Sequence, residues 1–176
     1  MKLRLTRFLP VTLVAAACLA FSPDTSTDYN HHIDFSKYHT YSWIGVRAGN
    51  SLWQDRITGA VDSELAAKGW TRVASGGDAA VSAFGRATER DTLQTFYGGF
   101  PGWGWHGWAG MTTATTTVIP ERVGNLTVDI FDGSNKQLIW RGVISEVLSD
   151  KPEKNEKKLN EEVSKIFKHF PPPPKG

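Results

Sequence analysis

Cysteine is scarce in this sequence of 176 residues, which contains Cys18 and no other. A lone cysteine excludes a disulfide within the chain. A segment of membrane-spanning length is also lacking at the N-terminus. The apolar run from Leu9 to Ala17 is broken by Pro10 and Thr12. It is shorter than the about 20 residues that a spanning helix needs.

Motifs for catalysis are missing as well. The sequence has no Gly-x-Ser-x-Gly nucleophile elbow and no Walker-type phosphate loop. Carboxylates are plentiful, but none stands beside a partner that would separate two pKa values for acid and base work. His31 and His32, with Asp34 nearby, come nearest to a metal site, yet adjacent side chains in a strand point to opposite faces. We predict no catalytic residue, no metal site and no cofactor.

The N-terminus has the layout of a secretory signal. Lys2, Arg4 and Arg7 precede the apolar run, small residues follow at positions 15–17, and the chain becomes polar from Ser22. This pattern is typical of a cleaved signal peptide, here over residues 1–20, and predicts an exported protein. Removing the three basic residues lowers the 20 basic residues to 17, against 18 acidic ones. No basic stripe is left, so we expect no nucleic acid as a partner.

Whether the exported chain is anchored to a membrane depends on what happens to Cys18. It follows three alanines, as in a lipobox, where the cysteine is lipidated and becomes the mature N-terminus. A lipid there would tether the protein to a membrane surface, in the periplasm or at the outer membrane. Cleavage after Ala20 would instead discard Cys18 and leave a chain that starts at Phe21. In a third alternative Cys18 is only a small residue of the apolar run.

The mature chain divides into a polar tether (residues 21–28), a single α+β domain (29–170) and a proline-rich, extended tail (171–176). Residue patterns within the domain predict strands over 40–43, 70–73, 79–90, 113–119, 126–130 and 138–148, with a hairpin turn at 132–135. No alternation of strand and helix typical of a parallel sheet occurs. We therefore predict an antiparallel β-sheet with two amphipathic helices packed on one face.

The first of these helices is predicted over residues 52–68. Ser51 and Gln54 have the spacing of a capping box, and Gly69 suits the position after the last turn. The second helix follows Pro152, and its apolar residues recur at helical spacing at Leu159, Val163, Ile166, Phe167 and Phe170. Its charged residues include Glu and Lys pairs four residues apart, which indicate a solvated face.

Glycine and tryptophan alternate in the segment from Tyr97 to Gly110, a composition that suits neither a helix nor a regular strand. Large aromatic side chains are costly to leave in water. They could fold over the sheet as a lid, form a surface that binds a peptide, glycan or partner protein, or enter a membrane interface. The candidate binding residues are Tyr97, Phe100, Trp103, Trp105, His106 and Trp108.

Several segments together resemble a known family: Tyr29 to Trp43, the Gly/Trp segment, Gly124 to Asp132, Leu138 to Gly142, and the Phe170-Pro171-Pro172 ending. They are similar to the bacterial domain-of-unknown-function family numbered 4136, over roughly residues 28–172. The resemblance implies an α+β fold and an envelope location, since members are mostly described as envelope lipoproteins. It implies no activity and no catalytic residues.

These observations lead to one main hypothesis and two alternatives. The main one is an exported, lipid-anchored envelope protein with a non-catalytic binding or structural role, whose partners are the membrane surface and an envelope protein or glycan. The first alternative is a cell-envelope hydrolase with two carboxyl groups in a cleft beside the Gly/Trp segment. The second is a packing unit of a larger assembly, with a broad apolar patch on the open sheet face.

Overall fold

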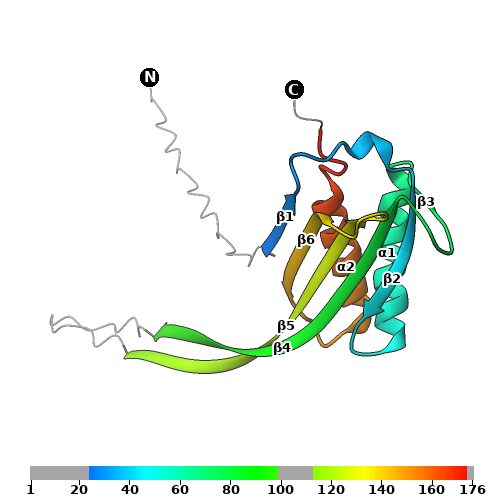
Figure 1. Cartoon of the computed structure of the whole chain (residues 1–176). Coiled ribbons are helices and arrows are strands. Elements are labelled where there is room, and N and C mark those ends of the chain that lie inside the picture. Colours follow the sequence, from blue (N-terminus) through cyan, green and yellow to red (C-terminus); the bar gives the residue numbers. More distant parts are fainter. Residues whose placement is uncertain (1–23, 99–112, 174–176) are drawn as a thin grey trace, which may run out of the picture.

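Six strands, two helices and a 3-10 turn make up residues 24–98 and 113–173, the part of the chain that the computed structural model describes (Figure 1). In chain order they are β1 (Asp24–Tyr29), the 3-10 turn (Phe35–Lys37), β2 (Thr40–Arg47), α1 (Ser51–Ala67), β3 (Thr71–Arg72), β4 (Ala79–Gly98), β5 (Thr113–Asp132), β6 (Leu138–Val147) and α2 (Pro152–Phe167). The strands form one sheet in the order β1-β6-β5-β4-β2-β3, and both helices lie on the same face of it. The predicted α+β class is confirmed.

The sheet is mixed, whereas the sequence predicted an antiparallel one. Strands β1, β6, β5 and β4 are antiparallel neighbours, but β2 pairs in parallel with both β3 and β4. The reason is α1, which follows β2 and carries the chain back along the sheet, so that the next strands run in the same direction as β2. A single crossover of this kind leaves no repeated strand–helix alternation in the sequence.

The central hairpin is longer than predicted. β4 continues past Arg90 to Gly98, and the two strands predicted over 113–119 and 126–130 are one strand, β5. The two strands pair without interruption from Ala79 with Asp132 to Gly98 with Thr113. Pro120 and the charged residues around it hid this continuity, because they interrupt the alternating apolar pattern on which the prediction rested.

The folded domain also includes more residues at both ends than the sequence predicted. Residues 24–28, predicted as a polar tether, form most of β1, the edge strand that pairs with β6 from Asp24 with Ser145 to Tyr29 with Trp140. An edge strand binds through its backbone, so its polar side chains gave no apolar signal. At the other end Pro172 is buried, so the proline-rich tail begins within the packed body and not as a free extension.

Helix α1 is delimited by its caps. The cap at its start is Asn50, whose side chain accepts a hydrogen bond from the Trp53 N–H at 3.0 Å, and not the predicted Ser51. At its end Gly69 has φ +83°, and the N–H groups of Gly69 and Trp70 donate to the carbonyls of Ala66 and Leu65. This is the hydrogen-bond pattern of a Schellman motif, as the sequence predicted from Gly69.

The core lies between the helices and the sheet. Ile57, Val61 and Leu65 of α1 and Val163, Ile166 and Phe167 of α2 are buried there. At the end near the chain's C-terminus, aromatic rings gather in edge and stacked contacts: Phe35, Tyr38, Trp70, Trp140, Phe167 and Phe170. The apolar pattern predicted for the second helix is therefore confirmed, with Phe170 contributing from just beyond its last turn.

Candidate functional site

Beyond the body of the sheet, β4 and β5 continue as a two-stranded ribbon (Figure 1). β2 stops pairing with β4 at Phe84, and β6 stops pairing with β5 at Val123. The next ten pairs, from Glu89 with Arg122 to Gly98 with Thr113, lie beyond both neighbouring strands, although the Arg122 carbonyl still accepts a hydrogen bond from the Leu148 N–H at 2.7 Å. We call residues 89–98 and 113–122 the arm. At the rise of an extended strand the arm is about 30 Å long.

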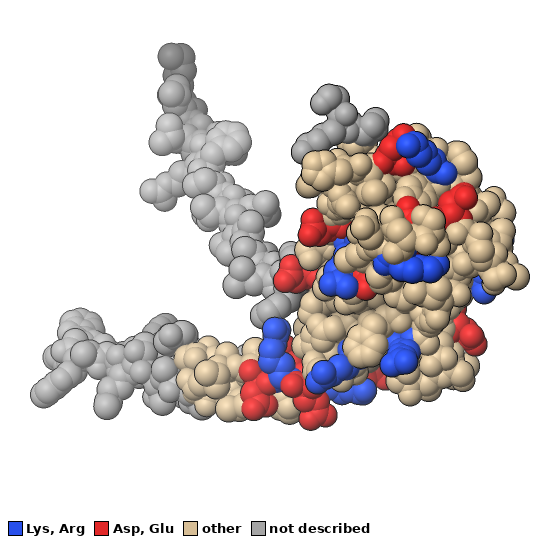
Figure 2. Space-filling view, viewed as in Figure 1, with Lys and Arg blue, Asp and Glu red and all other residues tan. Residues whose placement is uncertain are grey.

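Charge is distributed unevenly along the arm. From Thr92 to Pro120 the sequence contains no Asp, Glu, Lys or Arg. At the base, by contrast, Figure 2 shows acidic and basic side chains crowded together. The first pairs of the arm, Glu89 with Arg122 and Arg90 with Glu121, are charged on both strands. Beyond this charged base, Leu93 and Val118 are cross-strand partners and remain 69% and 54% exposed. The arm thus offers an uncharged, partly apolar surface to its surroundings.

The predicted binding residues stand in two groups relative to this arm. Tyr97 pairs with Ala114 close to the end of β4, so it belongs to the arm. Phe100, Trp103, Trp105, His106 and Trp108 fall between the two described parts of the chain, and the predicted lipidation site Cys18 precedes them, so these residues lie outside the described structure. β4 ends at Gly98 and β5 begins at Thr113, both at the far end of the arm, away from the body of the sheet (Figure 1).

A cavity of about 430 Å³ lies at the other side of the arm's base, between the two helices and the sheet. Its floor is formed by residues with little or no side chain, Gly85 and Ala87 of β4 and Gly124 of β5, where Gly85 pairs with Leu126 and Ala87 with Gly124. Farther along the same face of β4, Val81 fills the corresponding space and is fully buried. The cavity exists because small residues replace large ones where the helices reach the arm.

The cavity walls are mainly apolar, with a polar rim. Trp53 and Ile57 of α1 and Leu159 of α2 line it. At the rim, Lys158 Nζ bridges Glu146 Oε1 at 2.5 Å and the Val147 carbonyl at 2.9 Å. An apolar hollow with a few placed polar groups is the usual form of a small-molecule site.

Glu162 is the residue of this cavity that the sequence did not single out. It lies in the charged run of α2 that was predicted to be solvated, yet it is only 4% exposed and it lines the cavity. Its Oε1 accepts a hydrogen bond from Lys165 Nζ at 2.5 Å, and this hydrogen bond raises the pKa of Lys165. Its Oε2 is buried without a partner, the one such side-chain atom among the described residues. Only the helical spacing of the sequence could have indicated this burial. Position 162 precedes buried Val163 and lies on the same helix face as Leu159 and Ile166.

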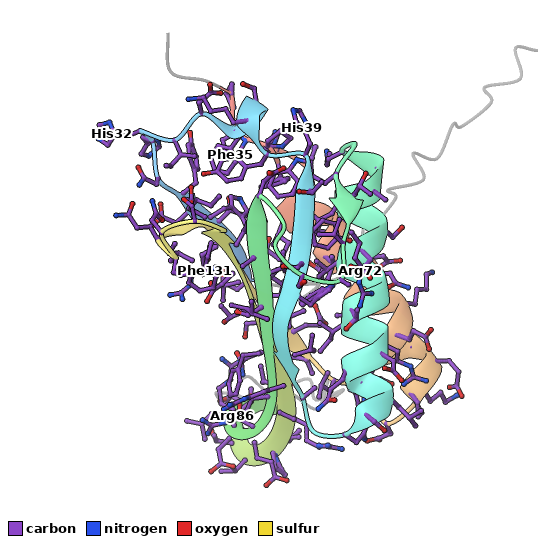
Figure 3. The ribbon with its side chains drawn as sticks, turned by 45° about the vertical axis from the view of Figure 1, so that its right-hand side comes forward. His32, Phe35, His39, Arg72, Arg86 and Phe131 are labelled. Carbon is purple, nitrogen blue, oxygen red and sulfur yellow. The ribbon has the colours of Figure 1, made fainter. Side chains whose placement is uncertain are left out.

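Other acidic residues at the helix–sheet interface are fully bonded. Asp62 Oδ1 accepts hydrogen bonds from the Tyr41 hydroxyl at 2.7 Å and from Trp43 Nε1 at 2.8 Å, and Oδ2 pairs with Arg72 at 2.7 Å. Figure 3 shows Arg72 extending toward α1. Burial, and then the hydrogen bond to Asp62, raises the pKa of Tyr41 well above its usual range. This cluster satisfies its own members, so we assign it to the fold.

Asp132, at the end of β5 far from the arm, is a second carboxylate whose hydrogen bonds stabilise the fold. Its carboxylate accepts hydrogen bonds from the Ser134 and Tyr38 hydroxyls, the latter at 2.6 Å, and these with the Asn135 N–H hold the pKa of Asp132 well below its usual range. Burial and this contact also raise the pKa of Tyr38. Asp132 thereby fixes the hairpin turn to the segment that precedes β2.

Neither a metal-binding cluster nor a membrane-spanning helix occurs in the described ranges. No group of three or more His, Cys, Asp or Glu side chains in residues 24–98 and 113–173 is arranged to hold a metal ion, and His32 and His39 stand apart in Figure 3. No helix in the same ranges has the length and apolarity to cross a membrane. The open face of the sheet carries the bidentate ion pair of Arg141 with Asp129, at 2.6 and 2.8 Å.

Solved structures with a similar fold are distant in sequence. A PDZ domain protein from Parabacteroides distasonis superposes with a TM-score of 0.58 and 14% identity over 86% of this chain, which spans 36% of that protein. The PelC dodecamer from Paraburkholderia phytofirmans superposes with a TM-score of 0.51 and 11% identity over 83% of this chain and 95% of the PelC chain. At such identities the likeness is one of fold alone. Among proteins of curated function, none matches this sequence.

The family resemblance of the sequence is confirmed by direct comparison with a family model. The model described as Domain of unknown function (DUF4136) matches residues 25–172, which include every strand and helix described above apart from the first residue of β1. The match contains the Gly/Trp segment and the arm that carries it, together with both helices and the cavity between them. The chain therefore belongs to the DUF4136 family.

Proposed function

We propose that this protein is exported, anchored to an envelope membrane by a lipid on Cys18, and binds another envelope component through its arm without catalysing a reaction. The single observation that carries the proposal is the arm itself, a ribbon of ten strand pairs that stands off the body and has no charged residue beyond its base. The Gly/Trp segment would be presented at its far end.

The energetics of the arm favour a binding role. A two-stranded ribbon is marginally stable at best in water, because it buries little apolar surface. Leu93 and Val118 are exposed on it and gain nothing from the core. Contact with a partner would bury these side chains, and the tryptophans beyond them have the flat apolar face and N–H donor that interfaces use.

The strand that follows the proposed anchor, β1, begins at the end of the sheet from which the arm extends. β1 starts at Asp24, which pairs with Ser145 of β6, two residues from the Val147 that pairs with Val123 at the start of the arm. Five residues lie between Cys18 and Asp24, and the six steps from one residue to the next span at most about 20 Å. A lipid on Cys18 would therefore hold the base of the arm close to the membrane surface, where an envelope partner is within reach.

The anchor is tested by the intact mass of the mature protein recovered from host membranes. A mass equal to the chain from Cys18 plus acyl groups is expected. A mass equal to the chain from Phe21, with the protein in the soluble periplasmic fraction, would contradict the lipid anchor and leave the arm as the only means of association.

The binding role is tested by replacing Trp103, Trp105 and Trp108 together with alanine. We expect an unchanged unfolding midpoint and a smaller complex when the protein is solubilised in mild detergent and sized. Leu52→Ala is the matched control, because Leu52 is an exposed leucine on the body, far in the sequence from the arm. A complex of unchanged size would contradict the proposed role, and a large loss of stability would mean that the tryptophans belong to the core.

A further inference from the structure

The open face of the sheet, which the helices do not cover, has a basic and apolar patch near the arm. Phe84 of β4 alternates with buried Ala83 and is 53% exposed on this face. Arg47 of β2 is its cross-strand partner, and Arg86 lies two residues farther along β4, so Phe84 has an exposed arginine on two sides. Figure 3 shows Arg86 on the side of β4 away from the helices. Ile44, the extra residue of a bulge in β2, is 60% exposed, and together with Arg47, Phe84 and Arg86 it forms what we call the open-face patch.

The two arginines of this patch are not neutralised within the fold. Neither Arg47 nor Arg86 forms an ion pair with any residue in the ranges 24–98 and 113–173. The arginine on the same face that does, Arg141, is bonded to Asp129. Unpaired cations beside exposed apolar side chains suit a partner that is itself anionic at its surface and apolar beneath it, as a phospholipid membrane is.

The proposed lipid anchor enters the fold beside this patch. Asp24, the first residue of β1, pairs with Ser145, which pairs with Asn125, which pairs with Arg86. These four residues form one row across the sheet, and its three strand spacings place Asp24 about 14 Å from Arg86. The chain from Cys18 to Asp24 spans at most about 20 Å. A membrane that holds a lipid on Cys18 is therefore within reach of the patch.

We propose that the open-face patch binds the anionic phospholipid surface of the membrane that holds the anchor. Arg47 and Arg86 would contact lipid phosphate groups, and Phe84 and Ile44 would enter the boundary between headgroups and acyl chains. This inference rests on the lipid anchor of the proposed function and adds the face by which the body contacts the membrane. Because β4 carries both the patch and the arm, the arm would begin at the membrane surface.

Vesicle flotation tests the patch in the absence of the lipid. The processed chain from residue 18 with Cys18→Ser cannot be lipidated, and every described strand and helix lies beyond that residue. We expect it to bind vesicles of phosphatidylglycerol and phosphatidylethanolamine at least about tenfold more tightly than vesicles of phosphatidylcholine, which carry no net charge. Arg47→Gln and Arg86→Gln should each weaken binding to the anionic vesicles about fivefold. Phe84→Ser should weaken it at least about threefold, since its exposed half is then not buried.

Two control variants separate the patch from general surface charge. The double variant Arg47→Lys with Arg86→Lys keeps both charges and should bind the anionic vesicles within about twofold of the chain with native arginines. Leu52→Ser with Lys154→Gln removes an exposed apolar and a basic side chain from the helices, and binding should not change.

The contrary outcomes are distinct from failure of the lipid anchor. Absence of flotation, equal affinity for the two kinds of vesicle, or unchanged affinity after Arg47→Gln with Arg86→Gln would overturn the patch. So would a photoreactive amino acid at position 84 that labels protein and no lipid in intact host cells, since the patch would then belong to an acidic partner protein. A mature chain that starts at Phe21 would contradict the anchor alone. Because the two kinds of vesicle are compared on one protein with the native patch, a variant that fails to fold does not prevent the test.

Discussion

In the body, Trp140 and Phe167 pack ring against ring between helix and sheet, whereas in the arm Leu93 and Val118 face each other in solvent on a ribbon with no third strand. The same pairing of β4 with β5 runs through both regions. Backbone hydrogen bonds are therefore common to the two, and what differs is burial. Apolar side chains stabilise the fold in the body, and in the arm they remain available to another molecule.

The largest loss of stability is expected from a substitution in the aromatic core. Trp140→Ala should reduce the free energy of unfolding by about 3–5 kcal/mol, because it removes a side chain that is almost fully buried and leaves a cavity. Urea unfolding followed by circular dichroism measures the loss. A change below about 1 kcal/mol would show that the core is not packed as described.

The next effect concerns the bonded carboxylate of α1. Asp62→Ala should cost about 1–3 kcal/mol, since it leaves the Tyr41 hydroxyl and the Trp43 N–H without their acceptor. Asp55, an exposed aspartate two turns earlier in the same helix, is the matched control. Equal urea midpoints for Asp62→Ala and Asp55→Ala would mean that the hydrogen bonds of Asp62 contribute nothing to stability.

Acid sensitivity should also be confined to the body, since the sequence from Thr92 to Pro120 has no carboxylate side chain. The pKa of Asp132 is lowered in the folded state by its hydrogen bonds. Its contribution is therefore complete above its unfolded pKa, at about pH 4, and is lost as the pH falls toward the lower folded pKa. Asp132→Asn should flatten the decline of the unfolding midpoint below about pH 4. Tyr38→Phe, which removes one of those hydrogen bonds, should flatten it in part, and unchanged slopes in both variants would contradict this assignment.

The smallest effect on stability is expected in the arm. Leu93→Ser and Val118→Ser should each change the free energy of unfolding by no more than about 0.5 kcal/mol, as exposed substitutions usually do. A loss of 2 kcal/mol or more in the same urea assay would show that the arm packs against the body.

The sequence predicted the parts of the fold that leave a periodic apolar signal. The spacing from Leu159 to Phe170 located α2, and Gly69 located the end of α1 correctly. β1 escaped notice because an edge strand that bonds through its backbone needs no apolar side chains. The parallel pairing of β2 was missed because direction is set by α1 as a crossover, which no local pattern encodes.

In the candidate sites, too, local sequence patterns were predicted and tertiary arrangements were not. The sequence singled out the Gly/Trp segment by composition, and it contains Tyr97 at the end of β4, but the arm that presents it depends on the long pairing of β4 with β5. Glu162 was not found, because a glutamate in a charged helical run resembles its solvated neighbours. Its burial follows from the orientation of α2 over the small residues Gly85 and Ala87, a tertiary arrangement.

The proposed division between a stable body and a binding arm is tested most directly by photo-crosslinking in intact host cells. A photoreactive amino acid is placed in the full chain at position 93, on the arm, or at position 52, on the body, where the native leucines are 69% and 65% exposed. Mass spectrometry of the adducts then distinguishes protein, glycan and lipid partners. The account predicts a defined adduct from position 93 and none from position 52. Equal labelling from the two positions, or none from position 93, would contradict it.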